Sequence, residues 1–185
     1  VEKHVPDLAS MNPVAVVKEF SETLIKELDF ANEADNTERF GEQFADSPAV
    51  KVPAILREFS STKVLTMEFI TGCPVNQPGL LRKQGIDPVE LSESISKLIF
   101  EQVLEHGFFH ADPHPGNLTV LNDGVMGVYD FGMMGEFSLG FRSSVAHLIA
   151  GLAEQDNRQV MGALIEMSEA GTAADTGKML RDVEQ

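Results

Sequence analysis

With 29 acidic and 14 basic side chains among 185 residues, the chain has a formal charge of -15, which argues against a nucleic-acid or anionic-membrane surface because both need clustered Lys and Arg. Apolar residues make up 43%, so we expect a globular chain with one domain, or most of a two-lobed one, rather than disorder. The single cysteine, Cys73, excludes an internal disulfide. The sequence has no apolar run of the roughly 18 residues that a membrane span needs, and no signal or transit peptide at its start. We therefore predict a location in the cytoplasm or peripheral to a membrane.

A long helix is predicted from about Pro13 to Phe40. Asn12 and Pro13 suit an N-cap and a first helical position. Apolar residues then recur at helical spacing, namely Val14, Val17, Phe20, Leu24, Leu28, Ala31 and Ala34. An antiparallel hairpin is predicted next, from Val52 to Phe59 and from Lys63 to Ile70, because two β-branched and apolar runs flank a short polar turn.

The second half of the chain groups a helix, a hairpin and two more helices. A Gly- and Pro-containing connector leads to a helix at about 88–106, with Gly107 as its C-terminal cap. NLTVL and VMGVYD flank the turn residues 122–124 and predict a second hairpin. Further helices are expected at about 139–154 and 158–170. Because strands and helices are grouped rather than alternating, the fold class is predicted to be α+β.

The stretch HADPHPGN, His110 to Asn117, is followed thirteen residues later by DFG at Asp130. Pairing of the second hairpin would bring Asn117 next to Asp130. Their amide and carboxylate oxygens suit a hard cation such as Mg²⁺, which takes few protein ligands and fills its octahedron with phosphate and water oxygens. Asp112 in the same loop is then placed to orient or deprotonate an attacking hydroxyl or water.

This H-x-D-x-x-x-x-N and D-F-G arrangement resembles the protein-kinase-like fold. Together with KELDFANEADN, Lys26 to Asn36, it resembles the UbiB-type atypical kinases linked to ubiquinone and other prenyl-quinone metabolism. The resemblance runs from about Val14 to Met161 and implies that Asp112 is the base, that Asn117 and Asp130 hold metal, and that the loop histidine is His110.

The same resemblance implies further site residues in the first part of the chain. Glu27 and Asp29 match the family's E-x-D signature, and Glu33 matches the glutamate that pairs with the ATP-binding lysine. On an uninterrupted helix Glu27 and Glu33 would differ by roughly 120° in direction and meet different partners. Glu68 to Ile70 would offer backbone groups to an adenine. Residues 1–70 would form a partial small lobe with a helix and a hairpin, and residues 71–185 a mainly helical large lobe.

The chain departs from the family where a Gly-rich or Ala-rich phosphate loop, a lysine strand and a K-x-G-Q motif should precede the first helix. Its loop-like opening, VEKHVPDL, suggests a fragment of a longer protein. We therefore expect this chain by itself to lack part of the small lobe, to bind ATP weakly if at all, and to be inactive in isolation.

Simpler interpretations stand beside the catalytic one. Asp112, Asn117 and Asp130 are residue types that also cap turns. His110 is favoured as a packed brace of the loop, and His114 is either a structural plug or a substrate contact. The acidic residues on the first helix would, without the family pattern, be a solvated face in an acidic chain.

The resemblance implies an ATP- and Mg²⁺-dependent phosphotransferase or ATPase that supports quinone synthesis. A prenyl-quinone precursor or another lipid would be its acceptor, and quinone biosynthetic proteins its partners. Two alternatives remain open. One is an aminoglycoside- or choline-type phosphotransferase, against which ELDFANEADN speaks. The other is a pseudoenzyme that binds nucleotide or lipid without turnover.

Overall fold

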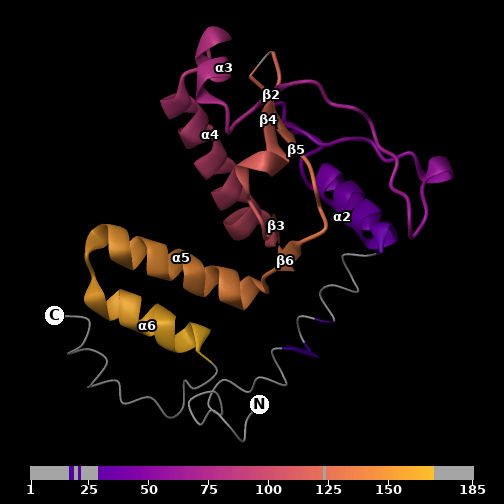
Figure 1. Ribbon diagram of the computed structural model, residues 1–185. Helices are drawn as coiled ribbons and strands as arrows, with labels where there is room; N and C mark the ends of the chain where they lie inside the picture. Colours follow the sequence, from indigo (N-terminus) through magenta and orange to yellow (C-terminus); the bar gives the residue numbers. More distant parts are fainter. Residues whose placement is uncertain (1–16, 19–20, 22–28, 123, 169–185) are drawn as a thin grey trace, which may run out of the picture. The chain divides into compact units, whose positions relative to one another are not determined.

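The computed structural model describes residues 17–18, 21, 29–122 and 124–168 (Figure 1). They belong to two compact units. The first comprises Val1–Pro88 and Ala111–Met134, and the second comprises Val89–His110 and Gly135–Gln185. Each unit is therefore built from two separate stretches of chain. The division into lobes at residues 70 and 71 stays a prediction.

Helix α2 of the first unit spans Phe30–Gln43 and begins where Asp29 adopts an extended conformation, with φ -104° and ψ 93°. The Asp29 carboxylate accepts the N–H of Ala31 at 3.0 Å, which makes Asp29 the N-cap. The prediction of one uninterrupted helix from Pro13 to Phe40 is therefore wrong at Asp29. Apolar spacing continues across this position, but a capping aspartate stabilises a helix start there. Because the helix begins after Asp29, the predicted angle of roughly 120° between Glu27 and Glu33 no longer follows from one continuous helix. Glu27 itself lies outside the described residues.

A four-stranded sheet in the order β1-β5-β4-β2 forms the centre of the first unit. Strands β4 (Leu118–Val120) and β5 (Met126–Val128) are antiparallel, with Leu118 opposite Val128, as the second predicted hairpin requires. Gly124 has a φ of 83°, which glycine adopts without steric cost. Two short strands complete the sheet: β1 (Val50–Lys51) runs parallel to β5, and β2 (Cys73–Pro74) antiparallel to β4.

The first predicted hairpin, Val52 to Ile70, is antiparallel but is not a regular pair of strands. Its ladder is reduced to two isolated bridges, Ile55 with Met67 and Ser61 with Val64, and a 3-10 turn, η2, spans Arg57–Phe59. Hydroxyl groups in this stretch hydrogen-bond to the backbone instead: the Thr66 hydroxyl donates to the Phe59 carbonyl at 2.7 Å. Such side-chain bonds compete with strand pairing, which explains the departure from the prediction.

The remaining elements of the first unit are short. Helix α3 spans Pro78–Lys83, and the 3-10 turn η4 spans Pro115–Asn117. The core of the unit gathers around the aromatic rings of Phe40 and Phe131, both fully buried, whose centroids lie 5.0 Å apart. The aliphatic residues Leu118, Val120, Met126 and Val128 of the sheet are also buried.

The second unit begins with α4 (Pro88–Phe100), which continues as a π-helical turn, η3 (Glu101–His106). Gly107 ends it with a φ of 78°, as predicted for a C-terminal cap. Strand β3 (Phe108–His110) pairs with β6 (Met134–Glu136). Helices α5 (Leu139–Glu154) and α6 (Asn157–Met167) lie side by side, close to their predicted bounds (Figure 1). A Cβ on Gly151 of α5 would lie 2.9 Å from the Val160 nitrogen, so glycine permits their close approach.

Within the described residues, every helix is too short or too polar to cross a membrane.

Candidate functional site

The loop from Ala111 to Asn117 is held in shape by its own hydrogen bonds. His114 donates its backbone N–H to the Asp112 carbonyl at 2.7 Å, and its ring Nδ1 accepts the N–H of Gly116 at 3.0 Å. The Asn117 side-chain Nδ2 donates to the same Asp112 carbonyl at 3.3 Å. Because this amide nitrogen is a donor here, the amide oxygen remains the acceptor that a hard cation requires. His114 thus has a structural role in the loop, and Asp112 and Asn117 are brought together.

The hairpin brings Asn117 close to Asp130 along the backbone. The Tyr129 N–H donates to the Asn117 carbonyl at 2.9 Å, so Asp130 follows directly after the residue opposite Asn117. Asp130 has a φ of 57°, in the left-handed region, which costs a non-glycine residue roughly 1–2 kcal/mol. Its Oδ1 lies 3.4 Å from the Gly132 nitrogen, which donates to it. The predicted approach of Asn117 to Asp130 agrees with this register, while their roles as metal ligands stay a prediction.

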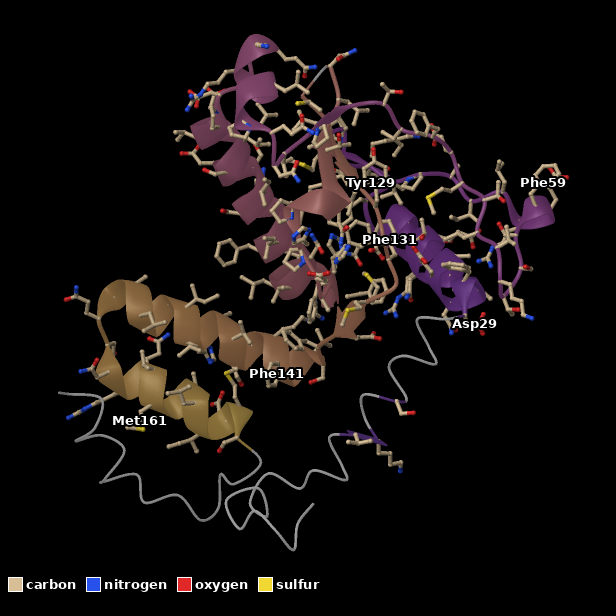
Figure 2. All side chains as sticks on the ribbon, in the orientation of Figure 1. Asp29, Phe59, Tyr129, Phe131, Phe141 and Met161 are labelled. Carbon is tan, nitrogen blue, oxygen red and sulfur yellow. The ribbon has the colours of Figure 1, made fainter. Side chains whose placement is uncertain are left out.

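Helix α2 fixes the residue that follows Asp130 at three points. The Asn36 Nδ2 donates to the Phe131 carbonyl at 2.9 Å, and the Phe131 N–H donates to the Glu33 carboxylate. The Phe131 ring packs on Phe40, a turn further along α2. Figure 2 shows Phe131 beside this helix. Sequence reasoning gave Asn36 no role. Its spacing of three residues from Glu33, which puts both on one helix face, was the available signal.

The Glu33 carboxyl is half-buried and lies near a second carboxylate. Burial raises its pKa, the negative charge of Asp130 raises it further, and the hydrogen bond from the Phe131 N–H partly opposes both effects. Two neighbouring acids with this electrostatic cost form a place that a cation would stabilise. No group of three or more His, Cys, Asp and Glu with metal-binding geometry occurs among the described residues. A carboxylate and an amide oxygen nevertheless suit Mg²⁺, which keeps several water or phosphate ligands.

Glu68 was predicted to contact an adenine through its backbone, and its side chain bonds to neighbouring residues of the first unit. Its carboxylate accepts Lys51 Nζ at 2.7 Å and the Ala54 N–H at 3.2 Å, and the Lys51 contact is the main reason that its pKa is lowered. The Glu68 N–H donates to the Ala54 carbonyl, and the Ile70 carbonyl accepts the Tyr129 hydroxyl. A carbonyl oxygen can accept a second bond. The adenine contact at Glu68 and Ile70 stays a prediction.

Two other predicted site residues, Asp29 and His110, make hydrogen bonds that involve the backbone. Asp29 caps α2, four residues before Glu33. His110, in the second unit, is buried, and its N–H donates to the side-chain oxygen of the buried Gln102 at 2.9 Å. Gln102 belongs to the π-helical turn η3, and such turns are frequent near functional sites. This environment agrees with the interpretation of His110 as a brace.

Comparison with known proteins gives concordant matches. Residues 1–164 match the model of the ABC1 atypical kinase-like domain. The chain is 39% identical over 175 residues to the chloroplastic protein ACTIVITY OF BC1 COMPLEX KINASE 8 of Arabidopsis thaliana, covering 94% of this chain and 23% of that protein. It is 42% identical over 141 residues to the uncharacterized protein slr1919 of Synechocystis, covering 76% of this chain and 25% of that protein. The chain thus spans about a quarter of the length of these relatives.

A solved structure is also similar. The Mycobacterium tuberculosis protein Rv3197, in complex with erythromycin, aligns with a TM-score of 0.67 and 29% identity, covering 91% of this chain and 44% of that chain. The match agrees with the protein-kinase-like α+β fold expected from HADPHPGN and DFG.

Proposed function

Because the chain belongs to the ABC1 atypical kinase-like family, we propose that it carries the central part of an ATP- and Mg²⁺-dependent phosphotransferase or ATPase. The observation that supports this most directly is the left-handed Asp130, placed one residue beyond the partner of Asn117 and beside Glu33. This arrangement gathers acceptor oxygens and negative charge where a phosphate-bound cation would be stabilised.

Each candidate site residue would have a different role in such a reaction. Asn117 and Asp130 would hold the cation, which would supply positive charge to neutralise the phosphates. Asp112 would orient the acceptor hydroxyl or water and accept its proton. The hydrogen bond from the Asn117 amide to the Asp112 carbonyl would hold the proposed cation ligand and the proposed base in place relative to each other. Glu33 lies beside Asp130 and would pair with a lysine contributed by another part of the protein.

The acceptor proposed for this reaction is a prenyl-quinone precursor or another lipid, with quinone biosynthetic proteins as partners. The proposal rests on the resemblance of HADPHPGN and ELDFANEADN to the UbiB-type kinases. A location in the cytoplasm or on a membrane surface would give access to such a substrate.

The test is nucleotide binding by the full-length protein that contains this chain. Thermal unfolding is measured with ATP, ADP or AMP, each with Mg²⁺ and with EDTA. We expect ATP and ADP to raise Tm when Mg²⁺ is present and to lose most of that effect in EDTA. An ATP effect that is identical with Mg²⁺ and with EDTA would contradict the cation site, and the absence of any nucleotide effect would contradict the proposed function.

A second candidate is a binding module without turnover. The solved relative from Mycobacterium tuberculosis is a complex with erythromycin, which shows a protein of this fold holding a small molecule. Release of phosphate or labelling of an acceptor lipid by the full-length protein separates the candidates. Mg²⁺-dependent ATP binding with neither product would favour the binding module.

A further inference from the structure

The residue after Asp130 is fixed to α2 by contacts that differ in their response to charge. Glu33, Asn36 and Phe40 lie on one face of the helix, where residues three and four apart are neighbours. Glu33 accepts the Phe131 N–H, but it also lies in the electrostatic field of Asp130, so a cation or a lysine entering the site would compete for it. Asn36 is neutral, and its bond to the Phe131 carbonyl needs no change when the local charge changes.

The opposite side of α2 is engaged elsewhere. Asp35 and Glu38 both pair with the Arg57 guanidinium, with 2.6 Å between Arg57 Nη2 and the Glu38 carboxylate. The helix is therefore attached to Arg57 on one side and to Phe131 on the other. Asn36 provides a hydrogen bond across 95 positions of sequence at that second attachment.

The position of the Phe131 carbonyl bears directly on Asp130. Asp130 occupies a left-handed conformation, and its own side chain makes a long 3.4 Å contact with the Gly132 N–H. If the Phe131 peptide were released, Asp130 would be free to relax to an ordinary negative φ, and its carboxylate would point elsewhere. The chain thus needs a fixed point immediately after Asp130.

We infer that Asn36 is the positioning residue that holds the Asp130–Phe131 turn in its cation-binding form, through its amide bond to the Phe131 carbonyl. This inference rests on the proposed function for the identity of the bound cation. It assigns to the last residue of KELDFANEADN a function separate from those of Glu27, Asp29 and Glu33. Asn36 does not touch the nucleotide in this proposal and acts through Asp130.

The test replaces Asn36 in the full-length protein by Leu, which has a similar size and no donor, and by Ala. Asn32→Leu and Asn32→Ala are matched controls, because Asn32 is an exposed asparagine one turn earlier on the same helix. The first readout is the Mg²⁺ concentration that half-saturates ATP binding, measured well below the unfolding temperature. We expect the Asn36 variants to raise it about 10- to 100-fold, as is common when a residue supporting a metal ligand is removed.

The second readout needs neither metal nor nucleotide. Hydrogen exchange of a peptide covering residues 130–132 should become faster in the Asn36 variants, while a peptide from β4 should keep the exchange rate of the wild type. A residue that only stabilises the fold would change both peptides and leave the Mg²⁺ requirement intact, and that result would overturn the inference. So would a Mg²⁺ requirement that rises no more than in the Asn32 controls.

Failure of the proposed function is a different result. If the wild-type protein shows no Mg²⁺-dependent ATP binding, the proposed function is contradicted, and hydrogen exchange alone decides whether Asn36 holds the turn. Unchanged exchange at residues 130–132 in both Asn36 variants would then overturn the inference as well.

Discussion

The Tyr129 hydroxyl donates to the Ile70 carbonyl at 3.1 Å and so joins the residue preceding Asp130 to the segment predicted to meet an adenine. A tyrosine of ordinary pKa, about 10, already keeps this proton at neutral pH. Burial raises the pKa of Tyr129 further, while a hydrogen bond with Thr119 partly opposes the shift. The two parts of the candidate site in the first unit are therefore connected by one phenol group.

Tyr129→Phe should lower the free energy of unfolding by about 1 kcal/mol or somewhat more, because it removes the phenol's hydrogen bonds with Ile70 and Thr119 and leaves the ring in place. Denaturation in urea measures the change. Ser96→Ala serves as a control, since it removes an exposed hydroxyl bond on α4 and should cost less. Equal stability of Tyr129→Phe and the wild type would show that the hydrogen bonds of this hydroxyl contribute nothing measurable.

Asp130→Asn should abolish Mg²⁺-dependent nucleotide binding while the fold is retained. The variant keeps the size of the side chain and an oxygen for the Gly132 N–H, but removes the charge that a cation needs. Isothermal titration with ATP and Mg²⁺, together with circular dichroism, provides the two readouts. Unchanged affinity in the variant would exclude Asp130 as a metal ligand.

Asp112→Asn should retain nucleotide affinity and lose turnover. Asn117 contacts the backbone carbonyl of Asp112, so the exchange leaves that tie intact while the side chain loses its capacity to accept a proton. A loss in kcat of about 100- to 10,000-fold is expected for removal of a general base. If turnover persists at the wild-type rate, Asp112 has no role as the base.

Glu33→Gln should alter how stability depends on pH. The folded protein holds the pKa of Glu33 above its ordinary value of about 4.5, first through burial and second through Asp130. Because the pKa of Glu33 is higher in the folded than in the unfolded protein, the fold favours the protonated carboxyl. The stability that this preference contributes is complete below the unfolded pKa and is lost as the pH rises through the folded pKa. The variant and the wild type should therefore converge at low pH, and the variant should become relatively more stable toward pH 7.

Urea denaturation at intervals between about pH 4 and pH 7 tests this sign. Glu42→Gln, an exposed exchange on the same helix, is the matched control. The pH series uses this chain alone, in which burial and Asp130 raise the pKa of Glu33. In the full-length protein, the lysine proposed to pair with Glu33 should shrink the difference between Glu33→Gln and the wild type, because a positive charge favours the ionised carboxylate. Parallel stability curves for the two proteins across this range would show that Glu33 has no coupling to folding.

Gln102→Leu should destabilise the second unit by about 1–3 kcal/mol, because it leaves the buried His110 N–H without the acceptor that Gln102 provides. Glu93→Leu, an exposed exchange on α4, tests whether leucine itself perturbs the helix. Both variants are compared by thermal unfolding. A Tm for Gln102→Leu equal to that of Glu93→Leu would mean that His110 finds another partner.

The sequence predicted elements whose signals are local. Turn residues 122–124 between two apolar runs predicted the β4–β5 hairpin, and Gly107 predicted the end of the helix expected at 88–106, whose last turn is π-helical in the structure. The break at Asp29 was missed because apolar periodicity does not register a side chain that bonds to the backbone two residues on. The irregular pairing between residues 52 and 70 was missed for a similar reason, since hydroxyl groups replace part of the ladder.

The candidate site was predictable to the extent that its residues follow one motif. HADPHPGN and DFG identify Asp112, Asn117 and Asp130, and the hairpin between them sets their register. The hydrogen bond from Asn36 to Phe131 depends on how α2 packs against the sheet unit, which no local pattern specifies. The π-helical turn that presents Gln102 to His110 likewise has no recognised sequence signature here.

The interleaving of the two units affects the order in which the chain can fold during its synthesis. Strand β1 is made early, but its partner β5 emerges only after residues 89–110, which belong to the other unit, have been translated. Those residues must in turn wait for Gly135 and its successors before their own unit is complete. A nascent chain that stalls near Pro88 would therefore carry β1 without its partner, and the edge of that strand would stay open until the second hairpin is translated.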